Sequence, residues 1–153
     1  MKKNRILLQI DEKYTASLIK TYLHKLNYNL SVHCRVEEAL KEIITGCYSV
    51  IILDYDVFYL FNTDFFYKAK EHNLFEFLIL LVSNISPPEM QNLYECQLVD
   101  KILEKPVCLP YLKYILHELN NDETSVSVYC HDEYTNYNSD NFTINNTRIK
   151  KDQ

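Results

Sequence analysis

Glycine is almost absent from this chain. One glycine, Gly46, stands among 153 residues, with four prolines and no tryptophan. Cofactors that carry phosphate groups usually bind at a glycine-rich turn that opens a helix, and the chain has no such turn. The composition therefore disfavours a cofactor-dependent α/β enzyme, and we expect this protein not to be an enzyme.

Cysteine pairs are missing as well. The five cysteines include no C-x-x-C pair, and their odd number does not suggest a disulfide framework. No group of histidines and cysteines has the spacing of a zinc site. We expect the thiols to be reduced and structural.

Clustered basic charge and long apolar runs are also lacking. The formal net charge is −5, and basic residues cluster only near the two ends of the chain. Binding to a nucleic-acid backbone needs grouped lysine and arginine, so we expect no nucleic-acid partner. The apolar runs are far shorter than the ~20 residues that span a bilayer, and the run after the basic start is too short for a signal peptide. We expect a cytoplasmic protein that does not bind membranes.

Five short apolar runs alternate with amphipathic segments, which is typical of α/β proteins with a parallel sheet. The expected strands are 5–10, 29–34, 48–53, 77–82 and 100–104. The expected helices are 12–26, 37–45, 63–71, 87–96 and 109–119. The aromatic segment 55–61 is expected to be an irregular connection. The pattern thus predicts five strands and five flanking helices in one domain, residues 1–119.

Helical spacing and turn residues give further expectations. Asn27 and Gly46 follow helices, where a left-handed conformation with positive φ is favourable for these residue types.

From residue 120 the chain becomes polar, and we expect the tail 120–153 to be disordered. The apolar residues predicted to face the core from the first two helices are Leu18, Ile19, Tyr22, Leu23, Leu26, Ala39, Leu40, Ile43 and Ile44.

Four polar residues stand at or just after the carboxyl ends of these runs, namely Asp11, Asp54, Ser83 and Lys105. Parallel strands deliver the groups at their carboxyl ends to one edge of the sheet, where ligand sites of open α/β sheets lie. Two carboxylates, a hydroxyl and an ammonium group at one edge suit a divalent cation and a phosphoryl group.

The segments that carry these residues, among them ILLQIDE, YSVIILD, LILLVS and ILEKP, occur in an order and spacing that resembles a response-regulator receiver domain of two-component signalling. The resemblance covers about residues 4–119. It implies a flavodoxin-like sheet of strand order 2-1-3-4-5. It also implies a phosphoprotein in which Asp54 accepts a phosphoryl group from a histidine kinase or a phosphotransfer protein and a downstream protein partner receives the signal.

The resemblance also implies roles for single residues. Asp11 and Asp54 match positions that bind Mg²⁺, and Asp56 stands where a backbone carbonyl usually contacts that ion. Ser83 matches the hydroxyl that hydrogen-bonds the phosphoryl group. Lys105 matches the lysine that pairs with it, and Pro106 matches a proline that commonly follows through a cis bond.

Several positions depart from the family pattern. Ile10 stands where the family usually has a first acid, Asn27-Tyr28 replaces a Gly-aromatic pair, Asn84 replaces a small residue, and Ile102 replaces an aromatic switch residue. Two accounts follow from these departures. Either Asp54 is phosphorylated, with altered metal use, or the domain is a degenerate receiver that acts as a phosphorylation-independent adaptor.

The aromatic content is high, with 13 tyrosines and 7 phenylalanines, many of them between Tyr55 and Tyr67. These rings either form a contact surface, because tyrosine is enriched at binding hot spots, or cover the core. The resemblance implies a contact face on the fourth helix, fifth strand and fifth helix, with candidate members Met90, Tyr94, Ile102 and Tyr111.

Overall fold

The computed structural model of the chain describes residues 4–60 and 63–121. The sheet and its first five helices belong to one compact unit that ends at Val107, and the last helix belongs to a second unit. The predicted polar tail lies almost wholly outside the described residues. In the described ranges, no helix combines the length and the apolar character needed to cross a bilayer.

The strands are β1 (Arg5–Gln9), β2 (Asn29–His33), β3 (Tyr48–Asp54), β4 (Phe75–Val82) and β5 (Lys101–Glu104). The helices are α1 (Lys13–Lys25), α2 (Val36–Thr45), α3 (Tyr55–Leu60), α4 (Thr63–Glu71), α5 (Pro87–Glu95) and α6 (Leu109–Asn120). All strand pairs are parallel, in the order β2-β1-β3-β4-β5. The predicted fold class and strand order are confirmed.

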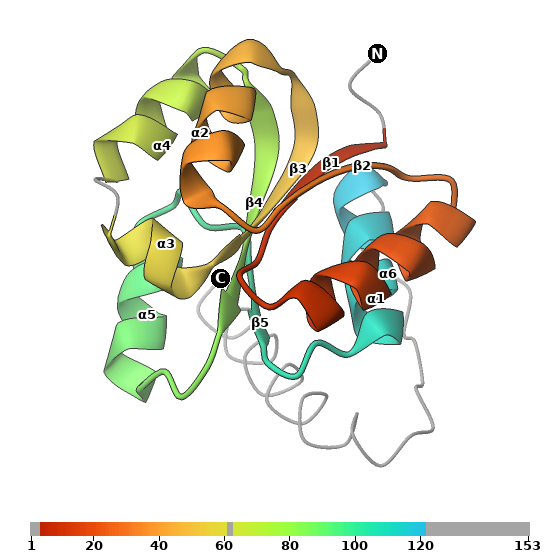
Figure 1. Cartoon of the computed structure of the whole chain (residues 1–153). Helices are drawn as coiled ribbons and strands as arrows, with labels where there is room; N and C mark the ends of the chain where they lie inside the picture. The colour runs from red at the N-terminus through yellow and green to blue at the C-terminus, as the bar shows by residue number, and fades with distance from the viewer. Residues whose placement is uncertain (1–3, 61–62, 122–153) are drawn as a thin grey trace. The chain divides into compact units, whose positions relative to one another are not determined.

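The centre of the sheet is β3, whose seven residues are all buried. A continuous apolar run of this kind is typical of a parallel strand that is covered on both faces. Figure 1 shows α1 on one side of the sheet and α2, α3, α4 and α5 on the other. The carboxyl end of β3 therefore lies at an edge flanked by helices, which is where a site is expected.

The segment after β3 differs from the prediction, because it forms the short helix α3 instead of an irregular connection. No proline or glycine interrupts residues 55–60, so nothing in the segment breaks a helix. Val57 and Phe58 are buried, and the ring of Phe58 lies 5.4 Å from that of Phe66 on α4. Packing of these side chains on the core stabilises α3.

The left-handed turns follow the prediction at Asn27 but not at Gly46. Asn27 has φ 64°, and Asn4, Asn73, Asn84 and Gln97 also have positive φ. Gly46 has φ −104°. A Cβ atom at position 46 would lie 2.5 Å from Cε2 of Tyr48 and 3.0 Å from the carbonyl oxygen of Glu42. The glycine is therefore required for close approach between α2 and β3, and not for its backbone angle.

The predicted buried faces of α1 and α2 are too wide. Ile19 and Leu23 on α1 and Ile43 on α2 are buried as expected, but Leu18 is 44% exposed and Ile44 59% exposed. Each helix contacts the sheet through a narrow row of side chains, and the side chains next to that row are exposed to solvent.

Candidate functional site at the carboxyl edge of the sheet

Asp54 is the last residue of β3 and is 7% exposed. It pairs in register with Leu81 of β4, while Leu53 pairs with Gln9 of β1. The hydrogen-bonded neighbours on both sides hold the backbone of Asp54 in place. The carboxylate is thus fixed at the edge of the sheet and is largely withdrawn from water.

Lys105 contacts Asp54 directly, because its Nζ forms an ion pair with Oδ1 of that carboxylate. The backbone N–H of Lys105 donates to the carbonyl of Val82 at 2.8 Å, which continues the β4–β5 ladder past the end of β5. The following bond, Lys105-Pro106, is cis, as the resemblance predicts. The ends of β3 and β5 are therefore bridged by a pair of opposite charges.

Asp11 reaches Asp54 through its main chain. Its backbone N–H donates to Oδ2 of Asp54 at 3.3 Å, while its side chain is exposed. One oxygen of the Asp54 carboxylate is therefore paired with an ammonium group, and the other accepts a long hydrogen bond. The end of β1 is thus the third strand end that converges on this carboxylate.

Ser83 and Asp56 lie at the same edge but stand apart from the ion pair. Ser83 follows β4, whose last residue Val82 pairs with Glu104, so Ser83 is level with Lys105. Asp56 is in the first turn of α3. Both residues are exposed, and neither has a hydrogen bond or ion pair to Asp54 among the described residues. Within residues 4–60 and 63–121, no three histidine, cysteine, aspartate or glutamate side chains gather as a metal-holding group.

The departures from the family pattern have visible consequences. Ile10, at the position of the family's first acid, has no exposed surface, and its backbone N–H donates to the carbonyl of His33 at 3.2 Å. Asn84 takes a left-handed conformation directly after Ser83. Ile102 is partly buried and packs against the core. Of the other predicted contact residues, Tyr94 is 45% exposed, whereas Met90 and Tyr111 are half-buried.

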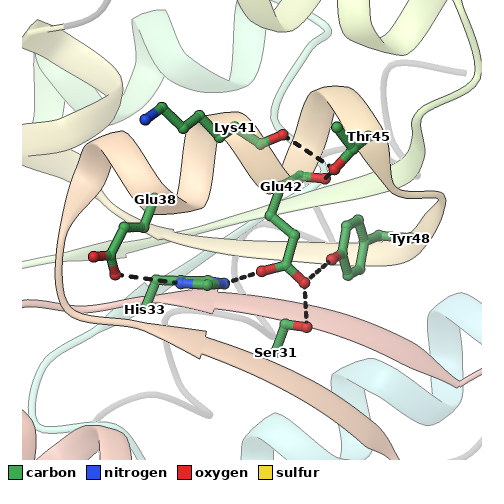
Figure 2. Close-up of polar contacts among 7 residues, drawn as sticks. All are labelled: Ser31, His33, Glu38, Lys41, Glu42, Thr45 and Tyr48. Carbon is green, nitrogen blue, oxygen red and sulfur yellow. Dashed lines mark hydrogen bonds and ion pairs between the residues drawn. The ribbon is translucent and has the colours of Figure 1, made fainter.

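A second polar cluster joins β2, α2 and β3, and the sequence did not predict it. Glu42 on α2 accepts hydrogen bonds from the hydroxyls of Ser31 (2.6 Å) and Tyr48 (2.5 Å), and its other oxygen contacts Nε2 of His33. Glu38 lies 3.8 Å from Nδ1 of His33. Figure 2 shows Glu42 pointing from its helix toward these partners on the strands.

The cluster shifts the ionisation of its members. Burial alone raises the pKa of Glu42, but hydrogen bonds from Ser31, Tyr48 and His33 outweigh burial, and the pKa is lowered from its ordinary value. Burial and the hydrogen bond to Glu42 raise the pKa of Tyr48. The members of the cluster are spread over two strands and a helix, so no sequence motif marks it.

Comparison with solved structures identifies the fold. The chain is similar to the receiver domain of Francisella response regulator 1452, with 26% identity over 76% of this chain and 96% of that one and a TM-score of 0.62. It is also similar to a response-regulator receiver domain from Clostridium thermocellum (20% identity, 77% and 94% covered, TM-score 0.64) and to an adenylate cyclase from Rhodopirellula baltica (21% identity, 76% and 86% covered, TM-score 0.64). No family model and no curated protein matches the sequence.

The strand order, the helices on both sides of the sheet and the ion pair at its carboxyl edge define a flavodoxin-like α/β domain built around a buried aspartate. Together with the structural similarities, they show that the chain has the fold of response-regulator receiver domains. The predicted resemblance to a receiver domain is thereby confirmed at the level of the fold.

Proposed function

We propose that this receiver accepts a phosphoryl group on Asp54 from a histidine kinase or a phosphotransfer protein and passes the signal on through protein–protein contacts. The observation that carries the proposal is the ion pair between Asp54 and Lys105 at the carboxyl edge of the sheet. A buried carboxylate with a cation on one oxygen is suited to accept a phosphoryl group on the other.

The chemistry follows from the arrangement of charges. An oxygen of Asp54 attacks phosphorus, the bond from phosphorus to the donor nitrogen breaks, and the electron pair goes to the donor imidazole, which takes up a proton. Negative charge spreads over the three equatorial oxygens in this step. Lys105 offsets the repulsion between carboxylate and phosphoryl group, and in this proposal the hydroxyl of Ser83 donates to a phosphoryl oxygen.

A Mg²⁺ ion fits this donor set. The ion commonly takes one or two carboxylates and completes its shell with water and phosphate oxygens. Asp11 and Asp54 would supply the carboxylates, and the backbone carbonyl of Asp56 would add a third protein oxygen. The ion would supply positive charge that offsets repulsion. Because Ile10 provides no carboxylate, we expect binding to be weaker than in a receiver with two adjacent acids after the first strand.

The product of the transfer carries the signal. A phosphorylated aspartate has more negative charge and more hydrogen-bond acceptors than the free carboxylate, so it can bias a surface between two states. In this proposal the protein is a cytoplasmic signalling module and not an enzyme. Its partners are the phosphodonor protein and a downstream protein, and neither nucleic acid nor membrane takes part.

Incubation with Mg²⁺ and acetyl phosphate, followed by intact-mass measurement, tests the proposal. We expect the unmodified protein and the Asp56→Asn variant to gain one phosphoryl group, and the Asp54→Asn variant to gain none. Beryllofluoride, read by NMR shifts around residue 54, provides a second measurement that does not depend on a stable phosphoaspartate. Failure of both reagents on the unmodified protein would instead support the phosphorylation-independent adaptor, for which the buried Ile10 is the structural argument.

A further inference from the structure

Helices α3, α4 and α5 surround an open pocket of about 610 Å³, which is lined by none of the residues Asp54, Ser83 and Lys105. Its size is within the range of sites that hold ligands or side chains of partners. Figure 1 shows the three helices next to one another on one side of the sheet. The pocket is lined by Tyr55, Phe58, Tyr59, Thr63, Tyr67 and Glu89, with Asn92, Leu93, Cys96 and Leu98 completing the wall on the α5 side.

Two of the three tyrosines of this pocket are exposed to solvent, whereas Tyr55 is partly buried against the core. Tyr59 is 76% exposed and Tyr67 is 41% exposed, while Phe58 and Phe66 are buried in the core. The aromatic segment therefore combines the two roles considered from the sequence, because Phe58 and Phe66 belong to the core while Tyr59 and Tyr67 contribute to the surface. A concentration of exposed tyrosine is typical of binding sites.

The aromatic walls are held in place. The rings of Tyr55 and Tyr59 are paired with centroids 6.0 Å apart, and the hydroxyl of Tyr67 donates to the carbonyl of Cys96 at 2.6 Å. The second contact ties α4 to the end of α5 across the pocket. A site whose rings are already ordered loses little side-chain entropy when a ligand binds.

The charge in the pocket is negative. Oε2 of Glu89 accepts hydrogen bonds from the backbone N–H (3.0 Å) and the hydroxyl (2.7 Å) of Ser86, and these bonds lower the pKa of Glu89. The carboxylate of Glu89 is therefore ionised at neutral pH, and it lines the same pocket as Tyr55 and Tyr59.

Lys70 contacts Leu98 of the pocket wall but does not cancel this charge. Lys70 donates to the carbonyl of Leu98 at 3.4 Å, and its ammonium group is paired with Asp100 at 3.2 Å. The positive charge of Lys70 is thus already offset by a carboxylate. Aromatic faces combined with one ionised carboxylate attract a cation, and a planar guanidinium both stacks on rings and pairs with carboxylates.

We propose that the pocket between α3, α4 and α5 binds an arginine side chain of a partner protein. Charge complementarity selects this occupant, because tyrosine rings and the Glu89 carboxylate together suit a guanidinium better than an apolar or acidic group. The inference does not rest on phosphorylation of Asp54, since Asp54, Ser83 and Lys105 do not line the pocket.

A peptide titration followed by NMR tests the proposal on the full chain. The probe is acetyl-Leu-Arg-Leu-amide, and its matched control replaces arginine with citrulline, which has nearly the same shape but no charge. We expect the arginine peptide to shift amide signals of α3, α4 and α5 and to bind about 3- to 30-fold more tightly than the citrulline peptide. Equal shifts from both peptides, or shifts spread over the whole molecule, overturn the proposal.

Three variants locate the site. Glu89→Gln keeps a residue type that serves in the capping box at Ser86 but removes the charge, and we expect it to weaken binding of the arginine peptide by a similar factor. Tyr59→Leu should also weaken it. Tyr14→Leu, which changes a 72% exposed tyrosine on α1, should leave it unchanged. Unaltered binding by Glu89→Gln, with the melting temperature preserved, contradicts the assignment.

NMR measurements on the protein alone, without any peptide, test two other possible occupants of the pocket. If the combined change of Arg148, Lys150 and Lys151 to alanine shifts the same pocket signals, the chain's own basic end fills the pocket and a partner arginine is ruled out. If those signals move with protein concentration, a second copy of the chain is the occupant, and the proposal fails in the same way.

Discussion

At position 54 a single carboxylate combines burial, a fixed backbone and a direct contact with a cation. Its position after a buried apolar run could be predicted from the sequence, because parallel strands bring their carboxyl ends to one edge. The direct pairing of Lys105 with Oδ1 and the use of the Asp11 backbone could not be predicted. They depend on side-chain and main-chain directions that strand spacing does not determine.

Replacement of Lys105 by alanine should abolish the change that phosphorylation causes in the protein and should slow phosphorylation itself, while leaving the fold intact. Removal of its ammonium group leaves the carboxylate of Asp54 without the cation that offsets an incoming phosphoryl group, and we expect the rate of phosphorylation to fall at least about tenfold. Intact mass against time measures the rate, and circular dichroism checks the fold. Lys68→Ala, which changes an exposed lysine on α4, is the control and should react like the unmodified protein.

Glu42 gives the native state a predictable dependence on pH. Its folded pKa is lowered from the ordinary value of 4.5, so it contributes stability that is fully present above that value and is lost as the pH falls through the folded pKa. Glu42→Gln should therefore flatten the loss of stability in acid below about pH 4.5. Urea unfolding between pH 7 and pH 3 measures this, with the exposed Glu37→Gln as the control. If the stability of Glu42→Gln falls in acid as steeply as that of the unmodified protein, this role of Glu42 is excluded.

At the scale of single elements, the junction between α2 and β3 depends on the absence of one side chain. Gly46→Ala should destabilise the protein by about 1–3 kcal/mol, because the new methyl group would overlap the ring of Tyr48. Thermal or urea unfolding measures the loss. Cys47→Ala, at an exposed neighbouring position, should cost much less, and an equally large effect there would point to a general sensitivity of this turn.

The positions of the strands could be predicted better than the burial of individual residues. Each of the five strands lies within two residues of its predicted bounds, because alternation of apolar and amphipathic segments is a strong signal. The sequence does not predict the helix α3, because the aromatic segment that forms it has no clear helical periodicity. Ile44 was placed in the core because it is apolar, although contact with a flat sheet requires only a narrow row of a helix.

At the scale of the whole molecule, stability should be greatest in the middle of the sheet. The strand β3 has a partner on each side and is buried throughout its length, whereas β2 and β5 lie at the two margins of the sheet. We expect the amides of Val50, Ile51, Ile52 and Leu53 to exchange with solvent more slowly than those of β2 and β5. Hydrogen–deuterium exchange read by NMR measures the rates, and faster exchange in β3 than in β2 would contradict this order.

The whole-molecule architecture could be predicted from the sequence because strand order is tied to the family that the motifs resemble. The pocket between α3, α4 and α5 could not, since it depends on how three helices pack and on which aromatic rings turn outward. Tyr59 and Phe58 are neighbours of similar size in the sequence, yet one is 76% exposed and the other 4% exposed. Their different environments follow from the turn of the helix and not from composition.

The two marginal strands of the sheet are short, with five residues in β2 and four in β5. Unpaired backbone groups along such margins are the places where chains can stack on one another and grow into fibrils. Here an incoming chain would find only a few amides and carbonyls to pair with before the ladder ends. We therefore expect these margins to support little edge-to-edge pairing with a second chain.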